Sequence, residues 1–105
     1  MENSKQKNML TMLMKTQYDD IRDAEMMADY AMQAKSAGAD SIASFFAQRA
    51  KSRITSYDDT QRHVDNIIHE MKEEDGGSSD DTFRCAYTEH LTEWVQKIKD
   101  KISRW

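Results

Sequence analysis

Apolar residues recur every three or four positions over most of the 105-residue chain, the spacing that buries one face of an α-helix. Between about residues 5 and 36 the apolar positions are Met9, Leu10, Leu13, Met14, Ile21, Ala24, Met27, Ala28, Ala31 and Ala34. Continuing this stripe through its middle places Gln17 and Asp20 on the buried side, where leucine would be expected. The pattern therefore predicts a long helix whose buried face is interrupted by polar residues.

A second long helix is expected from about residue 40 to 74. Gly38 can end the first helix, because glycine tolerates the left-handed conformation, and Asp40 can cap the second. The expected buried stripe is apolar at both ends and polar in its middle: Ile42, Phe45, Phe46, Arg49, Arg53, Ser56, Thr60, His63, Val64, Ile67, Ile68 and Met71.

If the two helices close an antiparallel hairpin at Gly38, their polar middles face each other. We therefore expect a structural polar seam in the hairpin, consisting of Gln17, Asp20, Arg49, Arg53 and Ser56.

A shorter third helix is expected from about residue 81 to 104, after a loop at 75–80 that contains paired glycines and serines. Its stripe is Phe83, Tyr87, Leu91, Trp94, Val95, Ile98, Ile102 and Trp105. The chain is thus expected to be a single all-α domain over residues 1–105, built from two long antiparallel helices and a shorter third. Because the third helix cannot cover both long helices, we expect a homodimer or higher homo-oligomer to complete the bundle.

Composition narrows the possible functions. The net charge is −4 and no third of the chain is net basic, which argues against nucleic-acid and membrane-surface binding. No stretch approaches membrane-spanning length, and the N-terminus does not read as a signal peptide. The single cysteine, Cys85, excludes an internal disulfide, fits a cytoplasmic location, and has no CxxC partner that would indicate a catalytic thiol.

The stretch from Gln17 to Ser56 resembles the first helical pair of the rubrerythrin branch of the ferritin-like superfamily. Its turn matches at Ala34, Lys35 and Gly38, and the second-helix spacing matches at Ile42, Phe46 and Ala50. The resemblance covers about forty residues and implies a ferritin-like helical bundle.

At the positions where that family holds two iron or manganese ions, the residues differ. The first-helix glutamate falls on Asp20, and the glutamate and histidine of the E-x-x-H motif fall on Arg53 and Ser56. Arginine has no lone pair to give to a metal, so the resemblance implies a scaffold whose di-metal site is lost. We expect the Asp20 carboxylate to pair instead with the guanidinium of Arg53 or Arg49, within a chain or between subunits.

Other residues could still hold iron, manganese or zinc. Asp59 and His63 are four residues apart on one helical face, as are Asp65 and His69, so a displaced site could use Asp20, Asp59 and His63, within a chain or between subunits. Because His63 lies on the expected apolar stripe, a hydrogen-bonded core histidine is the favoured interpretation.

Two further clusters of acidic and histidine side chains lie on the first and third expected helices. The acids Asp19, Asp23 and Glu25 are expected to be solvated, and Glu89, His90 and Glu93 do not converge without another helix. The aromatic residues of the third helix are expected to be core or interface residues rather than the walls of a small-molecule pocket: Phe83, Tyr87, Trp94 and Trp105.

Three functions remain. The favoured hypothesis is a non-catalytic ferritin-like module for dimerisation and binding of an unknown protein partner, with no cofactor. The alternatives are a metal-binding oxidoreductase or iron-storage-type protein, and a binder of small ligands in the bundle core. The sequence contains no glycine-rich phosphate loop and no G-x-S-x-G nucleophile motif.

Overall fold

The computed structural model describes residues 2–75 and 81–103, with side chains described for residues 5–71 and 86–103. These residues form three α-helices and no strand: α1 (Glu2–Ser36), α2 (Asp40–Asp75) and α3 (Asp81–Ile102). The predicted all-helical class is confirmed. Residues 76–80 of the expected loop, the side chains of Phe83 and Cys85, and Trp105 lie outside the described residues.

The turn between α1 and α2 is closed by backbone hydrogen bonds around Gly38. The Gly38 N–H donates to the Lys35 carbonyl at 3.0 Å, and the Ala39 N–H donates to the Ala34 carbonyl at 2.9 Å. Gly38 has φ +77°, the left-handed conformation of a helix-ending glycine. This pair of bonds satisfies two carbonyls at the end of α1 and sends the chain back along it.

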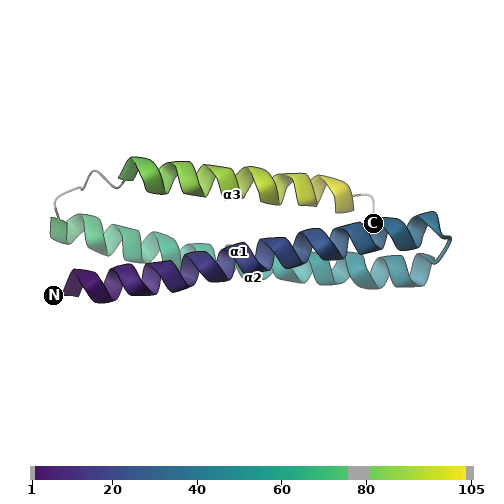
Figure 1. Cartoon of the computed structure of the whole chain (residues 1–105), viewed down its shortest axis with the longest axis horizontal. Coiled ribbons are helices and arrows are strands. Elements are labelled where there is room, and N and C mark those ends of the chain that lie inside the picture. Colours follow the sequence, from purple (N-terminus) through teal and green to yellow (C-terminus); the bar gives the residue numbers. More distant parts are fainter. Residues whose placement is uncertain (1, 76–80, 104–105) are drawn as a thin grey trace.

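Residues early in α1 contact residues late in α2, so the two helices run in opposite directions side by side (Figure 1). Gln6 contacts Glu70 at 3.5 Å, and Gln17 contacts Gln61 at 2.6 Å. The molecule is slender, measuring 56 × 20 × 14 Å along its principal axes. No described helix is long and apolar enough to cross a membrane.

The contact between α1 and α2 is made by residues that alternate three and four positions apart, the spacing of coiled coils. In α1 these buried or half-buried residues are Leu10, Met14, Gln17, Ile21, Ala24, Ala28 and Ala31. In α2 they are Ala43, Ala47, Ala50, Ile54, Tyr57, Gln61, Val64, Ile68 and Met71.

The expected stripe of α2 is correct at Val64, Ile68 and Met71, but before Val64 the core lies one residue further along the chain than expected. Ile42 and Phe45 are 53% and 55% exposed, whereas Ala43 and Ala47 are fully buried. The core positions nearest the turn are alanines, and these give a weaker apolar signal than the larger residues beside them. The helix therefore turns its small residues inward and leaves large apolar residues at the edge of the contact.

Helix α3 packs along one side of the hairpin (Figure 1). Its buried residues form one apolar cluster with both long helices: Ile21, Ala24, Ala28, Ala50, Ile54, Tyr57, Leu91, Val95, Ile98 and Ile102. A second cluster, nearer the N-terminus of α1, is centred on Leu10, Val64 and Met71, and its described members all come from α1 and α2. Among the residues whose side chains are described, α3 contributes buried residues to the first cluster only, and Tyr87 of α3 donates a hydrogen bond to the Met14 carbonyl beside the second.

The contacts of α1 show which side α3 leaves uncovered. Glu25 bonds to Trp94 of α3, whereas Asp23 pairs with Arg53 of α2. Two positions along an α-helix correspond to a rotation of about 200°, so these two acids point to nearly opposite sides of α1. We call the side of the hairpin turned away from α3 the open face, comprising Met9, Met12, Leu13, Thr16, Asp20, Asp23, Tyr30, Ile42, Phe45, Phe46, Arg49, Arg53, Ser56, Thr60, His63 and Ile67.

Candidate functional site

The centre of the hairpin is polar, and part of it is buried as expected. Gln17 is fully buried and Asp20 is 9% exposed. The Ser56 hydroxyl donates to Asp20 Oδ2 at 2.8 Å, and Gln17 Nε2 donates to Gln61 Oε1 at 2.6 Å. Both buried side chains of α1 are therefore held by neutral groups of α2, and Gln61 belongs to this network although sequence reasoning had not included it.

Within the chain, Asp20 bonds to Ser56, and the arginine expected to pair with it contacts another acid. Arg53 Nε lies 2.6 Å from Asp23 Oδ2, one helical turn beyond Asp20, and both side chains are partly exposed. Arg49 is exposed, and its guanidinium lies over the ring of Phe45, 5.4 Å from the centroid. Because the helices run in opposite directions, Ser56 faces Asp20 and Arg53 faces Asp23.

The displaced metal site is not assembled within one chain. Asp59 is exposed and paired with Arg62 at 2.8 Å. His63 is also exposed, which corrects its expected place in the core. Among the residues whose side chains are described, no group of three or more His, Cys, Asp or Glu could hold a metal ion. Asp20, Asp59 and His63 therefore do not converge within the chain.

Apolar side chains gather at both ends of the open face. At the end near the N-terminus of α1, a groove of about 530 Å³ is lined by Met9, Met12, Leu13, Thr16, His63, Asn66, Ile67 and Glu70. At the end near the turn, Tyr30 and Phe45 each contact Phe46 with ring centroids 5.3 Å apart. These ends are separated by the polar seam, so the open face alternates apolar, polar and apolar along its length.

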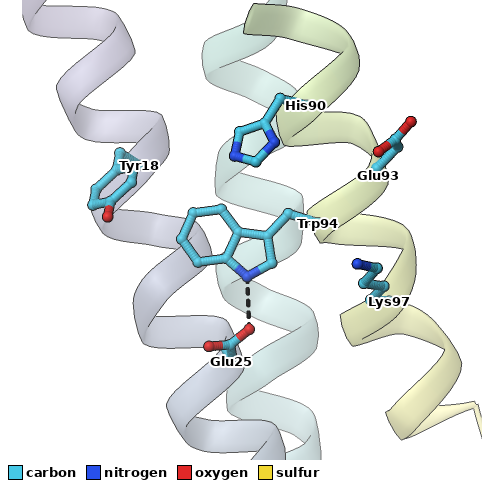
Figure 2. A pocket seen from close by; sticks show the side chains of 6 residues that line it. All are labelled: Tyr18, Glu25, His90, Glu93, Trp94 and Lys97. Carbon is cyan, nitrogen blue, oxygen red and sulfur yellow. Dashed lines mark hydrogen bonds between the residues drawn. The ribbon is translucent and has the colours of Figure 1, made fainter.

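A second hollow, of about 400 Å³, lies between α1 and α3, away from the open face. Figure 2 shows the six side chains that line it: Tyr18, Glu25, His90, Glu93, Trp94 and Lys97. Trp94 Nε1 donates to Glu25 Oε2 at 2.6 Å, and the Tyr18 and Trp94 rings meet edge to face at 5.3 Å.

The sequence analysis singles out His90, Glu93 and Trp94 of this lining but does not predict the hollow, whose other wall comes from α1. Glu25 was expected to be solvated, yet it accepts the indole hydrogen bond of Trp94. The signal that could have found it is the spacing of Tyr18 and Glu25, seven residues apart and so on one side of α1. Tyr87 and Trp94 are half-buried and pack against the larger apolar cluster, as expected of core residues.

No model of a known protein family matches the chain, and no curated protein or solved structure matches it either.

Proposed function

We propose that this protein is a non-catalytic helical-bundle module that associates with a second copy of itself through the open face. The observation that carries the proposal is the exposure of large apolar side chains at both ends of that face. Met9 is 43% exposed and Met12 60%, while at the other end Tyr30 is 40% and Phe45 55% exposed. Contiguous exposed apolar residues of this kind are typical of protein interaction sites.

A second copy fits this face better than an unrelated partner, because the face is complementary to itself. In a two-fold dimer the same surface occurs on both sides, so its charges must not repel their own copies. The centre of the open face carries two acids, Asp20 and Asp23, and two bases, Arg49 and Arg53, whose charges sum to zero. Apolar ends on either side of a neutral centre can therefore meet a second copy without a net charge at the interface.

The arrangement of the helices supports the same conclusion, because α3 packs along one side of the hairpin and leaves the open face on the other. Two hairpins packed on their open faces would form a four-helix layer, with each α3 on the outside. This arrangement buries the open faces of both copies, as a four-helix bundle buries the apolar faces of its helices.

The proposed module is a ferritin-like scaffold, as the resemblance of its hairpin implies, without the di-metal site. In the proposed scaffold Asp20 and Ser56 bond to each other, and Arg53 bonds to Asp23. Residues at the former ligand positions would then serve to align the two helices rather than to hold metal.

Sedimentation velocity over a range of protein concentrations tests the proposal. Met9→Asp places a charge in the open face, whereas Met32→Asp places it two residues from Tyr30, about 200° around α1 and off that face. Both methionines are 43% exposed, so the two variants are matched in residue type, helix and exposure. We expect the wild type and Met32→Asp to dimerise, and Met9→Asp to dimerise at least about tenfold more weakly.

A wild type that stays monomeric at millimolar concentration, or equal effects of the two substitutions, would reject the proposal. Circular dichroism of each variant separates loss of the dimer from loss of the fold. Metal analysis of the purified dimer tests the alternative of a site shared between subunits. About one tightly bound iron, manganese or zinc per chain would favour that alternative over a non-catalytic module.

A further inference from the structure

The hollow between α1 and α3 combines aromatic rings with a carboxylate at one wall. Figure 2 shows Trp94 reaching from α3 toward α1, with Tyr18 on the opposite helix and His90 one turn before Trp94 on α3. The Tyr18 and Trp94 rings are inclined by 66°, and the His90 ring centroid lies 6.4 Å from that of Trp94. The three rings thus form an angular wall rather than a flat stack.

The charged side chains that line this hollow favour a cation, and the Arg22 guanidinium over Tyr18 adds a positive charge outside the lining. Glu25 and Glu93 contribute two negative charges and Lys97 one positive charge to the lining. Glu25 is fixed by the hydrogen bond from Trp94 Nε1, so its carboxylate stays beside the indole ring. The faces of tyrosine and tryptophan rings attract cations, and weakly hydrated organic cations lose little by leaving water.

A contact within the protein already illustrates this attraction. The Arg22 guanidinium lies over the Tyr18 ring, 5.9 Å from its centroid. Tyr18 is 45% exposed, so its ring is also accessible from solvent. The Trp94 side chain is half-buried and lines the hollow opposite Tyr18.

The geometry points to a binding site for a methylated or quaternary ammonium group in this hollow, with Tyr18 and Trp94 as the aromatic walls and Glu25 as the counter-charge. Lys97 is the unfavourable member of the lining, because its ammonium repels the ligand. The site lies on the side of α1 opposite the open face, so it does not depend on dimerisation.

Titration with tetramethylammonium chloride, followed by NMR at the indole N–H of Trp94, tests this site. Trp105→Phe leaves Trp94 as the single tryptophan, and sodium chloride at equal concentration controls for ionic strength. We expect a saturable shift of the indole resonance with tetramethylammonium and none with sodium.

Three variants, one of them a control, assign the effect to the named charges. Glu25→Gln keeps an acceptor for the indole N–H but removes the charge, and should weaken binding about fivefold or more. Glu89→Gln removes an exposed acid of α3 that does not line the hollow, and should leave binding unchanged. Lys97→Met should strengthen binding by a similar factor, an effect opposite in sign to that of Glu25→Gln.

A shift that grows without saturation, or that is the same with sodium, would overturn the proposal. So would equal affinities for the wild type and Glu25→Gln, provided that near-ultraviolet circular dichroism shows α3 still packed. If Glu25→Gln releases α3, Lys97→Met carries the test alone, and unchanged or weaker binding by that variant rejects the site.

Discussion

Gln17 and Gln61 are joined by a 2.6 Å hydrogen bond between the two apolar clusters of the hairpin. Gln61 in turn donates to Asp65 at 2.9 Å, so the network leads from a fully buried amide to an exposed carboxylate. Within this network Gln17 Oε1 is buried and has no hydrogen-bond partner. The pair therefore fixes the alignment of α1 and α2 at some cost in stability.

Replacing Gln17 with leucine should raise the free energy of unfolding by about 1–2 kcal/mol, because a buried unpaired oxygen costs about that much. Leucine would also join the two apolar clusters into one. In Gln17→Leu the Gln61 Oε1 atom no longer accepts the hydrogen bond from Gln17, but Gln61 is half-buried and can bond to water instead. Urea unfolding of Gln17→Leu and Gln17→Ala measures the effect, and the alanine variant, which leaves a cavity, should be less stable than the leucine variant. A destabilised Gln17→Leu would contradict this account.

Asp20 depends on Ser56 for the hydrogen bond to its buried carboxylate. Ser56→Ala removes the donor and leaves the oxygen poorly satisfied, so we expect a loss of about 1–3 kcal/mol. Ser52→Ala, one turn earlier at an exposed position of α2, is the matched control and should change stability by less than about 0.5 kcal/mol. Thermal or urea unfolding of the two variants provides the comparison. Equal stabilities would mean that Asp20 does not need this bond.

The limits of sequence reasoning can be traced to particular residues. The three helices follow from the 3–4 spacing of apolar residues and from Gly38, both of which act locally. Burial of Gln17 and Asp20 follows from the same spacing, because the stripe of α1 passes through them. These parts of the fold could be predicted without knowing which helix packs on which.

The predictions that the structure corrects concern how separate helices pack against each other. The stripe of α2 was placed one residue early, since Ala43 looks less apolar than Ile42. Arg53 was paired with Asp20 rather than Asp23, because the register of two helices is set by their packing and not by either sequence alone. For the same reason the hollow beside Trp94 could not be foreseen, as its walls come from α1 and α3.

Gly38 adopts φ +77°, and a Cβ added to it would meet no atom within 4 Å. The cost of a side chain there is therefore the cost of the left-handed backbone alone, about 1–2 kcal/mol for alanine. Gly38→Ala should lower the free energy of unfolding by that amount, and Gly38→Asn by less, because asparagine tolerates this conformation better. Urea unfolding ranks the three proteins. If the alanine variant matched the wild type, the turn would have to relax to a different conformation at no cost.

Tyr57 and Tyr87 make the stability of the folded chain depend on pH in the alkaline range, because their phenol groups are partly buried. Burial is the main cause that raises the pKa of Tyr57 above its ordinary value of 10.0; the hydrogen bond with Thr92 lowers it, and the nearby carboxylates of Asp58 and Asp65 raise it further. Burial likewise raises the pKa of Tyr87, and the negative charge that Tyr57 acquires adds to the effect. Above pH 10 the unfolded chain therefore releases phenolic protons that the folded chain retains, and the free energy of unfolding falls as pH rises.

Tyr57→Phe removes one of the phenolic protons that the unfolded chain releases and the folded chain retains. The fall in unfolding free energy between pH 10 and the raised pKa should then be shallower than in the wild type, by up to about 1.4 kcal/mol per pH unit. Urea unfolding at a series of pH values from 7 to 11 measures the two slopes. Between pH 7 and 9 tyrosine does not titrate in either state, so the variant should differ from the wild type by a constant there, which accounts for the lost hydrogen bond with Thr92. Parallel curves above pH 10 would show that Tyr57 ionises as easily in the folded chain as in the unfolded one, and that α3 does not exclude water from it.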